Sequence, residues 1–489
     1  MREVVIRFGV KEPLAGFSAR QRGAEVVVPT KKVLLLNPPG DRKFFRDYYC
    51  TKISKARYYY HPIDLVYLSG RFGAGYEVKV IDAIAETLEP SQCLAAIKEF
   101  DPHIVIFLIS SPSYEQDVRF LTNAKTVCPL ALFVGSGDVY REFKDRAFQD
   151  HPFLDAVLLD FSTPDIMTLI EAAGGQVIEN VIYRYNGRII VGQETHGHGR
   201  FSLPIPQWHL FPLDRYSFPF ALKRRIGTIL TDFGCPYTCT FCPISTLGFK
   251  LRDIESVIEE IRTLKSLGIH ELFIRDQTFG VNKQRTFELC RKIVEEGLNI
   301  GWTCFSRVDV VTDELLAAMR AAGCHTVMFG IETADDQTLK ALKKHTTTAQ
   351  TIRALELCRS NGLRTVGTFL IGLPGEPRES TLATIELAKG IGLDFASFNI
   401  ATPRFGTPFR DEALQKVWVD GTEIQMDSAK SKPIWMNQSL SNEEIYRLQR
   451  RAVRSFYLRP GYLMHRLVSL RTPFELVASV REAYGLLSS

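Results

Sequence analysis

Three cysteines lie close together near the middle of this 489-residue chain. Cys235, Cys239 and Cys242 occur in the run Gly-Cys-Pro-Tyr-Thr-Cys-Thr-Phe-Cys-Pro, whose glycine and prolines predict a loop. Because a four-iron cluster or a structural zinc takes four ligands, three thiolates at this spacing predict a metal centre with one position open to a reactant. Two other interpretations stay open: three ordinary thiols, and a zinc site completed by a distant histidine.

The segments around these cysteines predict a parallel sheet. From Gly227 onward, short apolar strands alternate with segments of helix length. Six strands are fewer than the eight of a closed barrel, so we expect a partial barrel. The cysteine loop follows its first strand, at the strand ends where parallel folds bind ligands. The expected strands are 228–230, 271–274, 300–305, 326–329, 365–371 and 395–400.

A second α/β domain is expected before the barrel. Five apolar segments alternate with helical ones, which predicts a doubly wound parallel sheet. These segments are 33–36, 78–81, 104–109, 131–134 and 156–159. We divide the chain into an N-terminal extension (1–31), this Rossmann-like domain (32–175), a hairpin and linker (176–226), the partial barrel (227–410) and a helical C-terminal region (411–489).

The cysteine run resembles the signature of radical S-adenosylmethionine (SAM) enzymes, in which an aromatic residue, here Phe241, precedes the last cysteine. The resemblance implies that Cys235, Cys239 and Cys242 hold a 4Fe-4S cluster and that SAM binds its free iron. Four later runs at expected strand ends resemble further sequence motifs of this superfamily, and they occur in the same order. They are Phe-Ile-Arg-Asp-Gln-Thr-Phe (273–279), Ser-Arg-Val-Asp (306–309), Gly-Ile-Glu-Thr (330–333) and Gly-Leu-Pro-Gly-Glu (372–376).

These runs supply the expected SAM-binding residues, among which Phe241 is also counted. A zwitterionic ligand with a ribose needs a cation for its carboxylate, and carboxylates for its ammonium and hydroxyl groups. We expect Arg307 to face the SAM carboxylate, Asp276 the amino group and Glu332 the ribose. Gly372, without a side chain, can come close to the adenine. The alternative for each charged residue is an ordinary strand-end salt bridge.

A doubly wound domain before such a barrel resembles the cobalamin-binding domain of one branch of the superfamily, class B. The resemblance implies that small residues at its strand ends cradle cobalamin: Pro39, Gly40, Ser110, Ser111, Gly135, Ser136 and Gly137. The Asp-x-His-x-x-Gly pattern of other cobalamin proteins is absent, so no cobalt-ligating histidine is assigned. His61 and His103 are expected to be structural. The alternative is a Rossmann-like domain with another ligand or with none.

Together the two cofactors imply a methyltransferase that acts on an unreactive carbon. One SAM would supply the methyl group through cobalamin, and a second would supply the deoxyadenosyl radical. The overall pattern is similar to that of bacteriochlorophyll side-chain methylases, so a tetrapyrrole is the favoured substrate. One alternative keeps both cofactors but performs oxidation or ring closure, as in the chlorophyll ring cyclase, or methylates another lipid or natural product. Another is a zinc-stabilised or corrinoid-carrying protein without radical chemistry. No catalytic side chain is assigned.

Composition limits the partners. A net charge of +5 without basic runs argues against nucleic acid, and no apolar stretch approaches the ~20 residues of a membrane span. Ten irregularly spaced cysteines and the lack of a signal peptide predict a cytoplasmic protein. The aromatic runs 48–49, 58–60 and 456–462 would suit a large apolar substrate, or be buried between domains. Residues 450–471 could touch a membrane surface, but a buried amphipathic helix is the favoured interpretation. An electron donor such as a ferredoxin or flavodoxin is implied.

Overall fold

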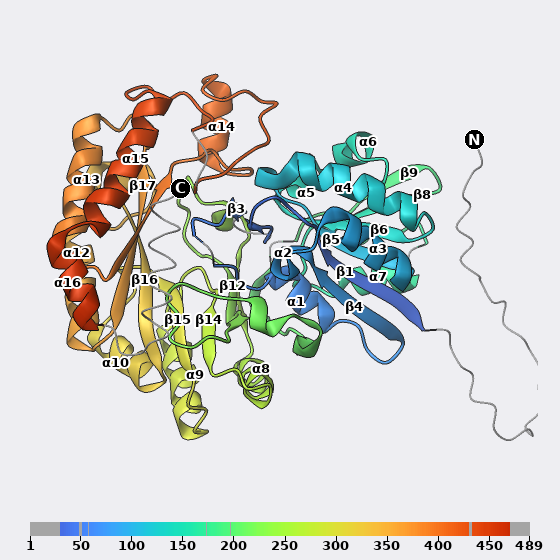
Figure 1. Cartoon of the computed structure of the whole chain (residues 1–489), viewed down its shortest axis with the longest axis horizontal. Coiled ribbons are helices and arrows are strands. Elements are labelled where there is room, and N and C mark those ends of the chain that lie inside the picture. Colours follow the sequence, from blue (N-terminus) through green and yellow to red (C-terminus); the bar gives the residue numbers. More distant parts are fainter. Residues whose placement is uncertain are drawn as a thin grey trace, which may run out of the picture.

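The computed structural model describes residues 30–47, 51–56, 58–172, 174–195, 197–429 and 433–469. Figure 1 shows two α/β lobes side by side, the first built by the N-terminal half of the chain and the second by the C-terminal half. The fold class expected from the sequence is confirmed: a doubly wound domain precedes a six-stranded partial barrel and C-terminal helices. Most of the expected N-terminal extension and Tyr48-Tyr49 lie outside the described residues.

The first lobe contains one seven-stranded sheet in the order β4-β1-β5-β6-β7-β8-β9, of which the first five strands are parallel. The strands are β1 (Lys31–Asn37), β4 (Tyr76–Asp82), β5 (Ile104–Leu108), β6 (Leu132–Ser136), β7 (Ala156–Leu158), β8 (Val181–Tyr185) and β9 (Arg188–Val191). The helices are α1 (Ile63–Ser69), α2 (Ala83–Glu86), α3 (Pro90–Phe100), α4 (Tyr114–Val127), α5 (Asp138–Phe143), α6 (Ala147–Asp150) and α7 (Asp165–Ala172).

Side chains of strand β1 alternate between two cores, as the period of a strand requires. Val33 and Leu35 pack in the core that contains α1 and α7, whereas Leu34 and Leu36 pack in the core that contains α3 to α6. Both faces of the sheet are therefore covered by helices. This explains why β1 is apolar at consecutive positions from Val33 to Leu36 and β5 is apolar throughout.

The hairpin expected within 176–226 is present at 181–191, with its turn at Asn186 and Gly187. Its first strand pairs antiparallel with β7, so the hairpin continues the sheet of the first lobe. The stretch that follows packs on its neighbours, since Trp208 and Tyr216 are buried.

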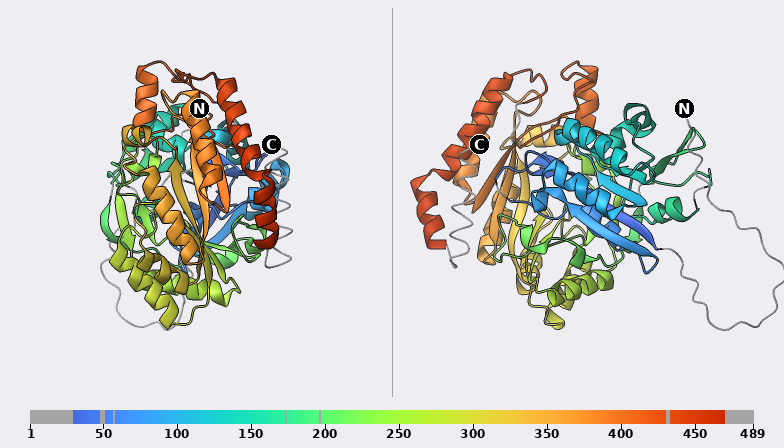
Figure 2. Two further views of the ribbon diagram at one scale, coloured as in Figure 1. Left: turned by 90° about the vertical axis from the view of Figure 1, so that its left-hand side faces the viewer. Right: turned by 45° about the vertical axis from the view of Figure 1, so that its right-hand side comes forward.

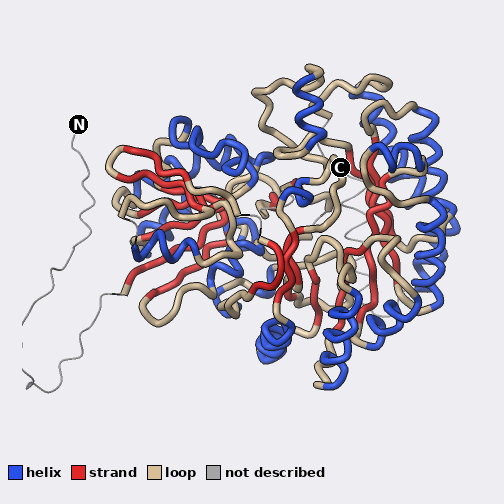
Figure 3. The backbone as a smooth tube through the Cα atoms, turned by 180° about the vertical axis from the view of Figure 1, so that it is seen from behind, coloured by secondary structure: helices blue, strands red, loops and turns tan. Residues whose placement is uncertain are grey.

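The second lobe contains a six-stranded, wholly parallel sheet in the order β11-β14-β15-β16-β17-β18. Helices lie on its outer side, and its open side faces the first lobe (Figures 2 and 3). The strands are β11 (Gly227–Ile229), β14 (Glu271–Ile274), β15 (Gly301–Ser306), β16 (Cys324–Glu332), β17 (Arg364–Ile371) and β18 (Phe395–Ile400). The helices between them are α8 (Ile254–Ser266), α9 (Lys283–Glu295), α10 (Asp313–Ala321), α11 (Asp336–Ala341), α12 (Thr348–Ser360) and α13 (Arg378–Gly390).

Three helices follow the barrel: α14 (Pro408–Gln415), α15 (Asn442–Tyr457) and α16 (Pro460–Ser469). Helix α15 begins with a capping box, in which Ser441 and Glu444 each accept from the other's backbone. The aromatic residues at its end are buried against the barrel: Phe456 is fully buried, and the Tyr457 hydroxyl donates to Ala396 O at 2.7 Å. Among the described residues, every helix is too short or too polar to traverse a lipid bilayer.

Two small sheets join the lobes. One pairs β10 (His198–Phe201), β13 (Phe249–Arg252) and β12 (Asp232–Gly234). The other pairs β2 (Phe44–Phe45) with β3 (Lys52–Ile53), which Figure 1 places between the lobes. Tyr60 follows β3 and packs edge-on against Phe273 of β14, with 3% of its surface exposed. Of the two interpretations of the tyrosine run, burial between domains is the one seen at Tyr59 and Tyr60.

Candidate functional site

The cysteine loop is the connection between β12 and β13, and its base is closed by the backbone. Gly234 pairs with Phe249, and Cys235 N donates to Gly248 O at 2.9 Å. Gly234 has a φ of +81°, and a Cβ there would lie 2.0 Å from Gly248 O. Only glycine fits this close approach, which fixes the direction in which the loop leaves the strand.

The three thiols differ in exposure. Cys239 is 7% exposed, whereas Cys235 and Cys242 are half-buried. Cys242 N donates to Cys239 O at 3.2 Å, so the two form one turn, while Cys235 Sγ lies 3.7 Å from Thr278 Oγ1 beyond β14. In the described ranges no three His, Cys, Asp or Glu side chains converge on a single metal ion. Ligands of a four-iron cluster bind separate irons, so they need not converge in this way.

Arg307, the residue after β15, lies beneath the loop. Its guanidinium is 3.7 Å from the Tyr237 ring centre, and Nη1 is 3.8 Å from Cys239 Sγ. Asp309 accepts both Nε and Nη2, at 3.0 and 2.8 Å, and Lys344 O accepts Nη2 at 2.7 Å. Arg307, the cation expected at the SAM carboxylate, therefore lies beside Cys239, one of the expected cluster ligands.

Lys344 and Glu332 form a buried ion pair next to Cys239. The two side chains are 8% exposed and 2.9 Å apart. Burial raises the pKa of the Cys239 thiol, and the charges of Lys344 and Arg307 oppose that rise. Glu332 ends β16 with a φ of +69°, a strained conformation for a residue with a side chain, of the kind that concentrates at functional sites. Lys344 was missed from the sequence, where nothing distinguishes it from the adjacent Lys343.

Both carboxylate oxygens of Asp276 accept hydrogen bonds from the chain. One of its oxygens accepts Thr231 N at 2.6 Å and Asp232 N at 3.1 Å, and Thr231 Oγ1 donates to the other. Asp276 therefore positions the backbone that leads from β11 into β12 and the cysteine loop. Burial and the nearby Asp276 charge hold the pKa of Asp232 well above its ordinary range.

Asp232→Asn is expected to flatten the dependence of stability on pH. A carboxyl group with a raised pKa in the folded state stabilises the fold at acid pH, and that contribution is lost as the pH rises toward the raised value. Urea unfolding at pH 5 and pH 8 should show a loss of stability for the wild type, to which this group contributes at most about 1.4 kcal/mol per pH unit, and a smaller loss for the variant. The same change in stability between pH 5 and pH 8 in both proteins would contradict the expectation.

Phe241 and Gly372 lie where the chain after β18 packs. Phe241 contacts the apolar cluster that includes Leu373, Phe409 and Trp435. Gly372 has a φ of +78°, and a Cβ there would lie 2.8 Å from the Ile445 side chain. Its missing side chain therefore makes room for α15.

In the first lobe, the loop after β1 is held by a buried arginine. Arg46 donates to Pro38 O at 2.7 Å and Pro39 O at 3.1 Å, and pairs with Asp117 at 2.7 Å. The next residue, Gly40, faces the Phe44 ring, which a Cβ would approach to 2.7 Å.

The loops after β5 and β6 carry the other expected cobalamin residues. Ser110 N donates to Asp117, and Ser111 donates to Asp138 from its N at 3.0 Å and its Oγ at 2.7 Å. A Cβ on Gly135 would clash with Tyr140, and one on Gly137 would lie 2.0 Å from Ile109 O. Neither position therefore has room for a side chain. The Ser136 hydroxyl is buried without a hydrogen-bond partner among the described residues.

His61 and His103, which were expected to be structural, both contact neighbouring residues of the fold. His61 is buried, stacks on Tyr216 with 3.8 Å between ring centres, and bonds Thr228 Oγ1 at 3.1 Å. Burial lowers the pKa of His61 to about 3. His103 Nδ1 accepts Lys32 N at 2.9 Å.

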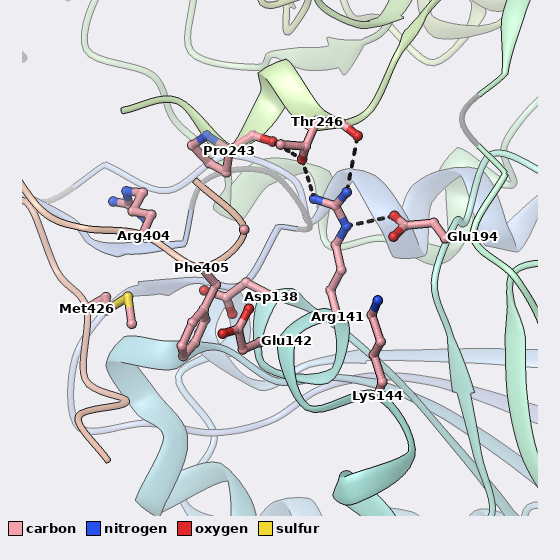
Figure 4. A pocket seen from close by; sticks show the side chains of 11 residues that line it. Asp138, Arg141, Glu142, Lys144, Glu194, Pro243, Thr246, Arg404, Phe405 and Met426 are labelled. Atoms are coloured by element: carbon pink, nitrogen blue, oxygen red, sulfur yellow. Dashed lines mark hydrogen bonds and ion pairs between the residues drawn. The ribbon is translucent and has the colours of Figure 1, made fainter. Parts of the chain in front are cut away.

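A cavity of about 380 Å³ lies between the first lobe and the cysteine loop (Figure 4). Arg141 of α5 crosses its wall, donating to Thr246 Oγ1 at 3.0 Å and pairing with Glu194 at 2.7 Å. Thr246 ends the short 3₁₀ helix that follows Cys242, so this contact ties the loop to the first lobe. The lining residues are Asp138, Arg141, Glu142, Lys144, Glu194, Pro243, Thr246, Arg404, Phe405, Gly406 and Met426.

This geometry agrees with comparisons to known proteins. The Radical SAM superfamily family model matches residues 229–388, the part that contains the cysteine loop and most of the barrel. An uncharacterized methyltransferase, PH0819, of Pyrococcus horikoshii is 33% identical over 451 residues, covering 88% of this chain and 94% of that protein. The chain therefore belongs to the radical SAM superfamily, as the cysteine run predicted.

Two further relatives have more specific names. A cytidylyl-2-hydroxyethylphosphonate methyltransferase of Streptomyces wedmorensis is 28% identical, with 80% of this chain and 83% of that protein covered. An anaerobic magnesium-protoporphyrin IX monomethyl ester cyclase of Rubrivivax gelatinosus is 26% identical, with 72% and 65% covered.

Two solved structures share the two-lobed fold. The radical SAM methyltransferase TsrM from Kitasatospora setae, solved with cobalamin and a 4Fe-4S cluster, aligns with a TM-score of 0.63 at 19% identity, covering 79% of this chain and 75% of that one. The cobalamin-dependent SAM radical enzyme OxsB, solved with aqua-cobalamin and SAM, aligns with a TM-score of 0.67 at 15% identity, covering 94% and 72%. At these identities the likeness establishes the fold.

Proposed function

We propose that this protein is a cobalamin-dependent radical SAM methyltransferase that methylates an unactivated carbon. The observation that carries the proposal is the position of the cysteine loop. The loop lies at the strand ends of the partial barrel, and a cavity joins it to the strand ends of the doubly wound lobe. Reactants held on the two lobes would meet in one shielded space, as a transfer between two cofactors requires.

The residues present fit a 4Fe-4S cluster. Cys235, Cys239 and Cys242 are the proposed ligands, and they leave one iron without a protein ligand. The cations Arg307 and Lys344 beside Cys239 would stabilise its thiolate, the form that binds metal. The proposed SAM-binding residues are Phe241, Asp276, Arg307, Glu332 and Gly372.

The first lobe fits a corrinoid at the ends of β1, β5 and β6. The buried Ser136 hydroxyl, with no partner in the described chain, supplies a hydrogen-bonding group for a ligand there. The proposed contacts are Pro39, Gly40, Ser110, Ser111, Gly135, Ser136 and Gly137. When bound, the cluster with SAM supplies a 5′-deoxyadenosyl radical and cobalamin supplies the methyl group.

The chain's own residues position these groups and keep water out. Arg307 and the Lys344–Glu332 pair set the charge around Cys239, while Asp276 fixes the backbone entering the loop. Arg141 holds the loop to α5 and so fixes the distance between the two lobes at the cavity. Each of these is a positioning role.

The favoured substrate is a tetrapyrrole of bacteriochlorophyll type, in keeping with the cyclase relative. That relative also supports the second candidate, a radical SAM cyclase or oxidoreductase with the same cofactors. A reduced ferredoxin or flavodoxin is the proposed electron donor, and a cytoplasmic enzyme that touches the membrane surface is the proposed setting.

Product analysis tests the proposal. The reconstituted protein, given SAM, cobalamin, a reductant and candidate tetrapyrroles without oxygen, should form S-adenosylhomocysteine together with 5′-deoxyadenosine. Deoxyadenosine without S-adenosylhomocysteine would favour the cyclase or oxidoreductase. A protein that binds neither iron nor sulfide would leave only a zinc-stabilised or corrinoid-carrying protein.

A further inference from the structure

Two neighbouring lysines of the first lobe lie in its interface with the barrel. Lys55 Nζ donates to Ser397 Oγ at 2.9 Å and to Phe398 O at 2.7 Å, both in β18. Lys52 Nζ lies over the Tyr60 ring, 5.8 Å from its centre. Both side chains are half-buried. The segment around β3 thus brings two amino groups into the interface between the lobes.

Lys52 and Lys55 have few negative neighbours among the residues that the structure describes. Neither Lys52 nor Lys55 forms an ion pair with any residue that the structure describes. Of the two carboxylates close by, Asp47 pairs with Arg275 at 3.0 Å. In Asp427, one oxygen accepts two backbone N–H groups, at 3.0 and 3.1 Å. Both carboxylates therefore already accept from other donors, and in the described chain neither forms an ion pair with Lys52 or Lys55.

The pKa of Lys55 reflects its burial and the positive charge of Lys52. Burial and then the charge of Lys52 lower the pKa of Lys55 to about 7, against the opposing effect of Asp427. These are the charged groups that face it from β3 and from the segment before residue 429. On β18 its partners are a hydroxyl and a carbonyl, both neutral. An added anion would stabilise the protonated amine.

We propose that Lys52 and Lys55 form an oxyanion site that holds a carboxylate or phosphate group of the substrate. A lysine ammonium has three donors, and Lys55 uses two of them on β18. β18 is the edge strand opposite β11, the strand that leads toward the cysteine loop. An anionic group anchored there would lie across the barrel mouth from the cysteines, with the rest of the substrate directed toward them. This inference rests on the proposed function and adds the substrate's chemical class.

Lysine labelling tests the site on the full chain, without cluster or radical chemistry. Competitive acetylation read by mass spectrometry should give a titration midpoint for Lys55 near pH 7, against about 10.4 for an ordinary lysine. Inorganic phosphate, or acetate, at constant ionic strength should raise that midpoint and slow labelling at pH 7.5 several-fold. Labelling of the exposed Lys98 should not change. Lys52→Gln should weaken the protection by phosphate.

The outcomes separate this site from its alternatives. A midpoint that neither anion shifts would overturn the proposal. Protection by SAM or by cobalamin, and none by phosphate or acetate, would assign the lysines to a cofactor and overturn it too. Because labelling needs no iron, its result is independent of the product assay that tests the methyltransferase.

Discussion

Cys239→Ala is expected to abolish the reductive cleavage of SAM. Cys239 is the most buried of the three loop cysteines and the one beside Arg307 and Lys344. Loss of a partner outside the ligand set typically costs ~10–100-fold in metal affinity or activity, so loss of a ligand should cost more. Anaerobic reconstitution, followed by iron and sulfide determination and assay of 5′-deoxyadenosine, measures the effect.

The matched control is Cys290→Ala. Cys290 is another buried cysteine of the barrel, on α9, 1% exposed and not part of the loop. This variant should keep its iron and lose only about 1 kcal/mol of stability for the small cavity. Cobalamin binding, read from the visible spectrum, should survive in both variants because the proposed cobalamin site lies on the other lobe. Iron content and SAM cleavage at wild-type level in Cys239→Ala would refute the cluster assignment.

Arg46→Met is expected to destabilise the first lobe by about 3–5 kcal/mol, the usual cost of leaving one partner of a buried ion pair alone. Arg46 and Asp117 are both fully buried, 2.7 Å apart, and Arg46 also binds two backbone carbonyls of the loop after β1. Since that loop carries Pro39 and Gly40, cobalamin affinity should fall as well. Urea unfolding and corrinoid titration measure the two effects.

Arg146→Met provides the control in the same lobe. Arg146 pairs with Asp150 at 3.2 Å, but their side chains are 64% and 42% exposed. Such a surface pair contributes about 0–1 kcal/mol, so this variant should behave like the wild type. The double variant Arg46→Met/Asp117→Leu should recover part of the lost stability, because it removes both buried charges. If Arg46→Met lost no more than Arg146→Met, the buried pair would not be what holds the loop.

The fold was predictable because its signals are local. Apolar segments of strand length alternate with helices in both lobes, and a parallel sheet covered on both faces requires such segments. The hairpin at 181–191 was also predictable, from Asn186-Gly187. Its pairing with β7 was not, since two strands distant in sequence meet only through the packing of the whole sheet.

The sequence by itself determined the cysteine spacing, the glycine that precedes it and the order of the strand-end motifs, because these depend on neighbours in the chain. Only the tertiary structure decided which charges surround each of those residues. Lys344 reaches Glu332 and Cys239, and Lys55 crosses from one lobe to β18 of the other. Charge–charge interactions depend on distance in space and on burial, and neither is written in the spacing of residues along the chain.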